Sequence, residues 1–247
     1  MVAHALTLPG LTVMALVPNL RGAQAAIAVG VHKLTIPVSA SAAHSLANVR
    51  KTREQMVDEV RAIVTLKNEV APMVKVEAGI STARGCTLQG DVAEDDVVRV
   101  VASVVAAGVD KAWLSHATGY ANPAQVQRLL RGVRAEIGDK TGAAHMHNTR
   151  GLGLANCLAA YEADARAFDS SVGGSEECPY APGASGNVVT EDLVFMFKAM
   201  CVSTGVDLNA LINAREVLKA GLPGELIYGM TPQADLTKGF HQSRIDR

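Results

Sequence analysis

The sequence predicts an α/β fold in which six βα units surround a parallel sheet. Short apolar runs alternate with longer segments of helical periodicity, and this alternation is typical of βα units. Of the 247 residues, 49% are hydrophobic and 19% are charged, which indicates a sizeable buried core. No Pro/Gly/Ser-rich linker is found before about residue 205. We therefore expect one domain, an incomplete α/β barrel, over residues 1–205 and a C-terminal helix with an irregular tail over residues 206–247.

Six apolar runs are the expected strands, and each ends in polar or small residues. They cover residues 11–17, 33–39, 73–81, 111–116, 143–147 and 165–172. Parallel α/β barrels build their active sites from the loops at the carboxyl ends of the strands. The residues that follow each run are therefore the candidate active-site residues.

Signals for helices lie between these runs. Asn122 is an N-cap residue placed before Pro123, which suits the first helical position, and Thr190 precedes two acidic residues. The valines of residues 93–108 repeat at helical spacing, so this segment is expected to be a helix despite its β-branched composition. A last helix is expected over residues 207–220, followed by an irregular tail.

Charge and cysteine content narrow the class of protein. The formal net charge is −1 with both signs interspersed, so the chain has no basic stripe for nucleic acid or an anionic membrane, and a small molecule is the expected partner. The four cysteines form no CxxC pair and indicate reduced thiols. No signal peptide or membrane-spanning run is recognisable, and we expect a soluble, cytoplasmic protein.

Two histidines are the first candidate ligands for a metal ion. His145 and His147 lie two positions apart on an expected strand, so both imidazoles point to the same side and can reach one ion. The Asn187 amide can add an oxygen, and carboxylates or water would complete an octahedral Mg²⁺ or Mn²⁺ site. Zinc is the second choice, because zinc sites more often show several Cys and His ligands. A pair of histidines that only hydrogen-bond at the sheet edge is an equally supported alternative.

Cys178 lies in a glycine-rich loop shortly before Asn187. Its thiol can donate or accept a proton if its surroundings tune its pKa, whereas a buried cysteine is usually an inert hydrophobe. The neighbouring Glu176 and Glu177 disfavour the thiolate, because negative charge raises a thiol pKa. The residue pattern alone therefore leaves both interpretations open.

Several segments resemble the signature regions of the 3-hydroxy-3-methylglutaryl-CoA lyase family. They are Val17-Pro-Asn-Leu-Arg-Gly22, Ser41 to Asn48, Gly85-Cys86, His145-Met-His147-Asn-Thr-Arg-Gly151, Asp169-Ser-Ser-Val172, Cys178-Pro-Tyr-Ala and Gly183-Ala-Ser-Gly-Asn187 to Leu193. The resemblance extends from about residue 10 to about residue 215, far beyond a chance motif match.

The resemblance implies a metal-dependent (β/α)₈ TIM barrel that cleaves a carbon–carbon bond in a 3-hydroxy-acyl-CoA, giving acetyl-CoA and a ketoacid such as acetoacetate. It implies that His145, His147 and Asn187 bind Mg²⁺ or Mn²⁺ and that Cys178 is an acid/base on a mobile loop. His145 is also expected to be catalytic. Ser41, Asn48 and Arg150 are the expected contacts to the acyl-CoA substrate.

Three single positions and one loop stretch depart from the family pattern inside the expected site. His116 stands where the family has an Asp, and a histidine can still move protons, although a surface histidine is at least as well supported. Asn148 replaces an Asp, and Arg150 replaces a Tyr and is suited to a phosphate or carboxylate. The stretch Gly174-Ser-Glu-Glu-Cys178 replaces Gly-Leu-Gly-Gly-Cys, so a stiffer and more acidic loop is expected.

The family's first two βα units have no match in this chain. The first match lies before the family's third strand, so about 60 residues, with an Arg-Asp pair and a Glu, are expected to be absent. The expected fold is thus a TIM barrel truncated to about six βα units.

The sequence leaves three functional interpretations. The first is a lyase of this family, and the second is a related metal-dependent aldolase or Claisen-type condensing enzyme. The third is an inactive or assembly-dependent fragment, because an open barrel exposes strand edges; for the same reason a homo-oligomer is expected.

Overall fold

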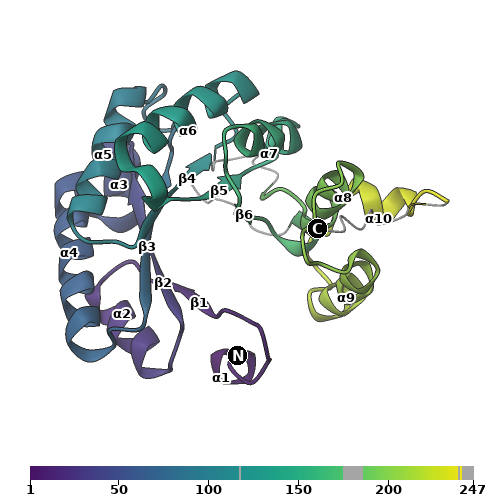
Figure 1. The fold of residues 1–247 in the computed structure, drawn as a ribbon, viewed down its shortest axis with the longest axis horizontal. Coiled ribbons are helices and arrows are strands. Elements are labelled where there is room, and N and C mark those ends of the chain that lie inside the picture. The colour runs from purple at the N-terminus through teal and green to yellow at the C-terminus, as the bar shows by residue number, and fades with distance from the viewer. Residues whose placement is uncertain (117, 175–185, 239, 241–247) are drawn as a thin grey trace.

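Six parallel strands form one curled sheet whose order follows the sequence, from β1 to β6 (Figure 1). The computed structural model describes residues 1–116, 118–174, 186–238 and 240. The strands are β1 (Met14–Leu16), β2 (Lys33–Ser39), β3 (Lys75–Ser81), β4 (Lys111–His116), β5 (Thr141–Met146) and β6 (Phe168–Asp169). Because neighbouring strands are parallel and joined by helices, all their carboxyl ends lie at one edge of the sheet.

Helices cover the outer, convex face of the sheet (Figure 1). The helices are α1 (Val2–Ala5), α2 (Leu20–Ala28), α3 (Ala42–Val49), α4 (Arg53–Val70), α5 (Glu94–Ala106), α6 (Pro123–Ile137), α7 (Gly153–Glu162), α8 (Thr190–Ala199), α9 (Leu208–Gly221) and α10 (Met230–Ala234). Helices α2 to α7 provide the cover of the sheet, whereas α8, α9 and α10 pack together at one side. Capping boxes start two of the longest helices, α4 at Thr52 and α6 at Asn122. Among the described residues, no helix is both long and apolar enough to cross a membrane.

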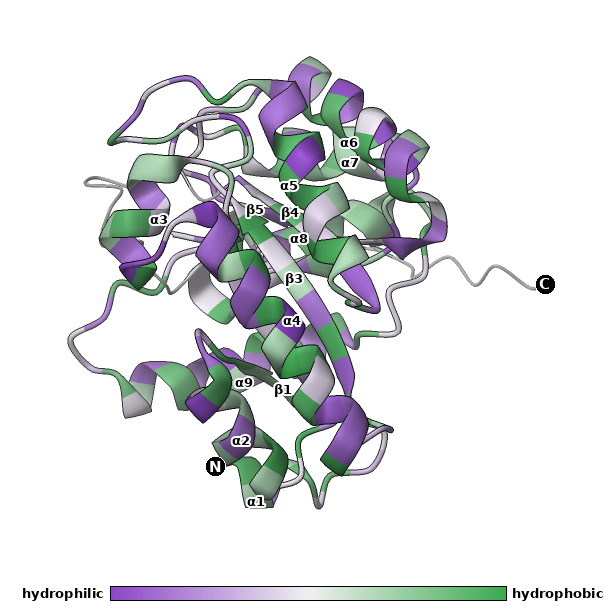
Figure 2. Cartoon of the chain, turned by 90° about the vertical axis from the view of Figure 1, so that its left-hand side faces the viewer, coloured by the Kyte–Doolittle hydropathy of each residue, from purple (hydrophilic) through white to green (hydrophobic). Residues whose placement is uncertain are grey.

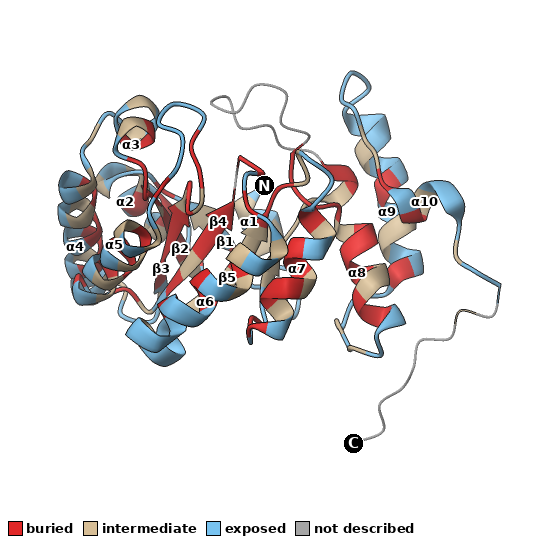
Figure 3. Cartoon of the chain, turned by 90° about the horizontal axis from the view of Figure 1, so that it is seen from above, coloured by how far each residue is buried: buried red, intermediate tan, exposed pale blue. Residues whose placement is uncertain are grey.

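The core lies between the sheet and these helices. Alternate residues of β2, namely Leu34, Ile36 and Val38, are fully buried and face the helices. The helices are amphipathic, with hydrophobic and hydrophilic residues in alternating patches (Figure 2). Their outer sides are exposed, while most residues of β2, β3 and β4 are buried (Figure 3). Burial of this apolar layer fixes the sheet and thereby the loops at its carboxyl edge.

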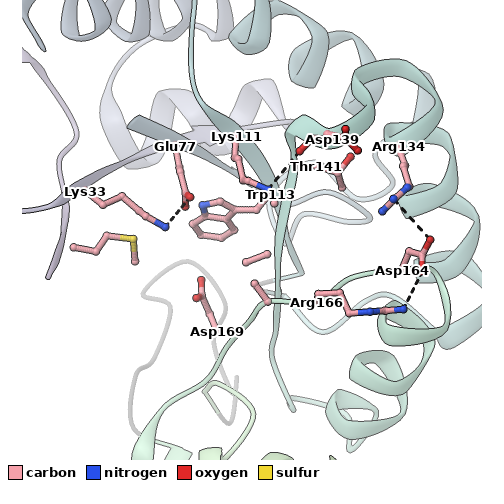
Figure 4. A pocket seen from close by; sticks show the side chains of 14 residues that line it. Lys33, Glu77, Lys111, Trp113, Arg134, Asp139, Thr141, Asp164, Arg166 and Asp169 are labelled. Atoms are coloured by element: carbon pink, nitrogen blue, oxygen red, sulfur yellow. Dashed lines mark hydrogen bonds and ion pairs between the residues drawn. The ribbon is translucent and has the colours of Figure 1, made fainter. Parts of the chain in front are cut away.

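The inner, concave face of the sheet is polar and borders a cavity of about 580 Å³ (Figure 4). Lys33 of β2 and Glu77 of β3 form an ion pair of 2.8 Å on this face. Trp113 of β4 and Asp169 of β6 line the same cavity. The cavity therefore reaches from the amino-terminal ends of the strands up to the residues that surround His145.

The predicted strands are present, with shorter ends at the two edges of the sheet. β2 and β4 match the predicted ranges, whereas β1 and β6 contain only three and two residues. An edge strand pairs on one side alone, so fewer of its residues meet the criterion for a strand.

The prediction of an irregular tail is wrong at one point, because α10 contains Pro232. The Asp192 carboxylate accepts hydrogen bonds from the backbone N–H groups of Met230 (2.9 Å) and Thr231 (2.6 Å). A side chain distant in sequence thus caps the helix, and proline is tolerated in a first turn, where its missing N–H costs no helical bond.

Candidate metal centre

The imidazoles of His145 and His147 meet at the carboxyl end of β5. Their Nε2 atoms lie 3.0 Å apart, and their ring centroids lie 5.0 Å apart. The side-chain alternation of a strand puts residues two apart on one side, so the extended backbone at this point produces the pair. The sequence prediction that both rings share one side is thus reproduced.

Asn187 is held beside His147 by backbone pairing. The two residues form an isolated antiparallel bridge, and the flanking hydrogen bonds run from Asn148 N to Gly186 O and from Val188 N to Met146 O, both 3.0 Å. His147 is 4% exposed and Asn187 is 3% exposed. The residues after 185 therefore return to the end of β5 and place Asn187 opposite His147.

The donor set fits a divalent cation. At a metal–nitrogen distance of about 2.1 Å, two ligands at right angles are about 3.0 Å apart, which is the spacing of the two Nε2 atoms. Burial, followed by the nearby His145, lowers the pKa of His147 to about 3, so its imidazole is neutral, as a metal ligand must be. Within the described ranges, His, Cys, Asp and Glu side chains do not gather in threes. Water or substrate oxygens would therefore have to complete such a site.

Asp169 of β6 lies behind His145. Its Oδ2 is 3.7 Å from Nδ1 of His145, and the Trp113 ring lies 5.8 Å from the His145 ring. A carboxylate on the second nitrogen of a metal-binding histidine orients the ring and raises its basicity. Asp169 lies in the motif Asp169-Ser-Ser-Val172 but was not among the predicted site residues. Its position opposite His145 on the neighbouring strand is the feature that could have identified it.

His116 ends β4 and is fully enclosed. Neither of its ring nitrogens has a hydrogen-bond partner, and burial together with the charges of Arg84 and His145 lowers the pKa of His116 to about 3. The prediction of a surface histidine is therefore wrong, because this side chain is 3% exposed. A buried neutral imidazole without partners is costly, and a polar ligand would relieve that cost.

The three residues expected to contact substrate lie in loops or helices that follow strands. Ser41 is the buried N-cap of α3, where its hydroxyl accepts from His44 N and donates to Gln89. Asn48 is exposed in the last turn of α3. Arg150 is exposed, donates to the carbonyl of Thr118 at 3.0 Å and lies over a tyrosine ring. All three follow the carboxyl ends of β2 and β5, on the edge that carries the histidines.

The cysteine that the resemblance marks as catalytic, Cys178, lies outside the described residues. Among the described cysteines, Cys157 is buried in α7, and burial raises its pKa to about 12. Its thiol stays protonated at physiological pH. Cys157 is therefore a buried, unreactive cysteine, which is one of the two interpretations that the sequence allowed for Cys178.

Asn148 has a structural role at the start of the next helix. Its Oδ1 accepts a hydrogen bond from Gly153 N at 3.0 Å, at the first residue of α7. A Cβ at Gly153 would lie 2.6 Å from a methyl carbon of Val188, so this position needs glycine for close packing. The replacement of the family's Asp by Asn148 keeps the hydrogen-bond acceptor and removes the charge.

Comparisons with known proteins agree with this fold. A family model described as HMGL-like matches residues 3–218. The chain is 35% identical over 217 residues to a hydroxymethylglutaryl-CoA lyase of Bacillus subtilis, covering 87% of this chain and 72% of that protein. It is 37% identical over 209 residues to the (R)-citramalyl-CoA lyase of Chloroflexus aurantiacus, covering 84% of this chain and 65% of that protein.

A solved structure of a related lyase has a similar fold. An HMG-CoA lyase from Acinetobacter baumannii, in complex with coenzyme A and 3-methylmalate, superposes with a TM-score of 0.85 at 37% identity, covering 93% of this chain and 75% of that chain. The prediction of a TIM-barrel fold is confirmed, with the six described strands forming an open part of the barrel.

Proposed function

Because the chain belongs to the HMGL-like family, we propose that it is a metal-dependent carbon–carbon lyase acting on a 3-hydroxy-acyl-CoA. The proposed reaction gives acetyl-CoA and a ketoacid. The relatives support the reaction class, since they are named as lyases of hydroxymethylglutaryl-CoA and citramalyl-CoA. These two acyl groups share a 3-hydroxyl and a terminal carboxylate, and we propose that hydroxymethylglutaryl-CoA, cleaved to acetoacetate, is the substrate.

The geometry of His145, His147 and Asn187 is the observation that carries this proposal. The two imidazole nitrogens lie 3.0 Å apart, and backbone pairing places Asn187 opposite His147 at the carboxyl edge, which supports a shared ligand role for the three residues. We propose that these three side chains hold Mg²⁺ or Mn²⁺. A cation bound there supplies positive charge that polarises the hydroxyl and carbonyl oxygens of the substrate.

In the proposed reaction, a base takes the proton of the C3 hydroxyl and the bond between C2 and C3 breaks. The bonding electron pair moves to C2, giving the enolate of acetyl-CoA, while C3 becomes the carbonyl carbon of the ketoacid. An acid then protonates C2. We assign the acid to Cys178 on the resemblance.

His116 is the proposed acceptor of the hydroxyl proton. Its pKa of about 3 makes it a weak base in the enclosed state described above. An anionic substrate beside the ring favours the imidazolium and raises that pKa. The imidazole therefore becomes a stronger base when the substrate is bound.

Coenzyme A is the proposed carrier of the acyl group. The solved relative from Acinetobacter baumannii contains coenzyme A together with a small hydroxy diacid, 3-methylmalate. Arg150, exposed at the carboxyl edge, presents a guanidinium that can pair with a phosphate or carboxylate. Asn48 and Ser41, which follow β2, would lie along the same edge.

The proposal is tested by incubating the purified chain and Mn²⁺ with hydroxymethylglutaryl-CoA or citramalyl-CoA and measuring acetyl-CoA and the ketoacid by chromatography. We expect acetyl-CoA in equal amount to the ketoacid, with hydroxymethylglutaryl-CoA preferred and no product after the metal is chelated. The His145→Ala variant is the matched inactive control. Absence of both products from a Mn²⁺-saturated chain would overturn the proposed function.

A further inference from the structure

The residues that follow α9, here called the tail (residues 222–234), contact Gly173 and Asn187, which flank the segment 175–185 in the sequence. Helices α8, α9 and α10 pack together at one side of the molecule (Figure 1). Ahead of α10, the Tyr228 backbone N–H donates to the carbonyl of Gly173 at 3.0 Å, just before the segment. The Tyr228 hydroxyl donates to the backbone carbonyl of Asn187 at 3.2 Å, just after it. One residue of the tail therefore bonds to both Gly173 and Asn187.

Two glycines receive the tail side chains. A Cβ at Gly173 would lie 2.3 Å from a methyl carbon of Ile227, and a Cβ at Gly174 would lie 2.3 Å from Cε1 of Tyr228. Both glycines have positive φ angles, of 68° and 69°, which side-chain-bearing residues rarely adopt. The tail can approach this closely only because both positions are glycine.

A buried ion pair holds the tail in place. Arg215 of α9 donates to the Glu191 carboxylate of α8 at 2.9 Å, and the two side chains are 5% and 0% exposed. The same guanidinium donates to the carbonyls of Tyr228 (2.7 Å) and Ile227 (3.1 Å). Glu191 also accepts from the backbone N–H of Gly173. The Arg215–Glu191 pair thus joins the tail to Gly173.

We propose that Tyr228 is a positioning residue that sets the placement of Asn187 in the metal site. The hydroxyl bonds the Asn187 backbone carbonyl, while the phenol ring packs on Gly174, so Tyr228 links Asn187 to Gly174. The role rests on the proposed function, in which Asn187 binds the metal ion. The contact is to the Asn187 backbone, so the proposed effect of Tyr228 on metal binding is exerted through Asn187.

The test compares Tyr228→Phe with Tyr161→Phe in the whole chain. Tyr228→Phe removes the hydroxyl and keeps the ring on Gly174. Tyr161→Phe is the matched control, because Tyr161 lies in α7 and packs on Phe197, away from the metal site. Mn²⁺ affinity is measured by electron paramagnetic resonance. We expect a loss of about 2- to 10-fold for Tyr228→Phe and none for the control, from the loss of one hydrogen bond.

Hydrogen–deuterium exchange provides a readout that needs no metal. In Tyr228→Ala, peptides covering residues 186–190 and 168–174 are expected to exchange faster, while peptides of α5 keep their rates. Equal Mn²⁺ affinity in Tyr228→Phe and Tyr161→Phe, or unchanged exchange in Tyr228→Ala, overturns the inference. A chain without lyase activity that still shows both effects contradicts the proposed function and supports the inference.

Discussion

The Asp169 carboxylate lies 3.7 Å from Nδ1 of His145, on the nitrogen opposite to the one that faces His147. The two residues are directly opposite on neighbouring strands, so the sheet register itself brings the carboxylate to the ring. Because an imidazole that uses Nε2 for a metal ion is oriented through Nδ1, Asp169 is placed to orient His145.

Replacing Asp169 is expected to weaken metal binding without removing a ligand. In Asp169→Ala, we expect Mn²⁺ affinity to fall about 10- to 100-fold, as is typical for loss of a group that orients a ligating histidine. Isothermal titration calorimetry measures the change. Asp164→Ala is the matched control, because Asp164 is an exposed partner of Arg166. Equal affinities in the two variants would remove Asp169 from the site.

Gly79 of β3 makes room for Trp113, which packs beside His145. A Cβ at Gly79 would lie 2.5 Å from Cζ2 of the indole, so Gly79→Ala must displace the ring. We expect a loss of about 1–3 kcal/mol in the free energy of unfolding, measured with urea, together with weaker Mn²⁺ binding.

Gly132 provides the opposite case for the same substitution. It lies inside α6, and a Cβ there would meet no atom within 4 Å. Gly132→Ala is therefore expected to stabilise the chain by about 0.5–1 kcal/mol, through helix propensity. Similar destabilisation by both substitutions would show that contact with Trp113 is not the cause.

The Arg215–Glu191 pair is expected to dominate the stability of the C-terminal helices. Arg215→Met leaves a fully buried carboxylate without its cation, which costs about 3–5 kcal/mol of unfolding free energy. Lys219→Met removes the cation of the exposed pair with Glu216 and is expected to cost less than about 1 kcal/mol. Urea unfolding midpoints, compared at equal slopes, measure the loss of stability in both variants. Equal losses in Arg215→Met and Lys219→Met would contradict a dominant role for the buried pair.

The repeating βα pattern could be predicted from the sequence because burial gives it a period. The helix-facing residues Leu34, Ile36 and Val38 are apolar and fall at every second position of β2, and the valines of α5 repeat at helical spacing. The His145 and His147 pair was predictable for the same reason, since a strand places residues two apart on one side.

Contacts between distant segments could not be predicted. The Asp192 cap of α10 and the Arg215 contacts to the tail depend on how α8 and α9 pack, which no local pattern encodes. The burial of His116 depends in the same way on the loops that cover the end of β4. A single sequence therefore indicated the metal-ligand candidates but not the residues that orient and position them.

The most direct test of the metal centre is Mn²⁺ binding by His147→Ala. His147 is the central member of the proposed site, because it contacts His145 through Nε2 and pairs with Asn187 through the backbone. His4→Ala, in the short helix α1, is the control. We expect calorimetry to show one Mn²⁺ per chain for wild type and for His4→Ala. For His147→Ala we expect a loss of affinity larger than the roughly 10- to 100-fold that is typical of a group that only orients a ligand. Unchanged Mn²⁺ affinity in His147→Ala would contradict the account.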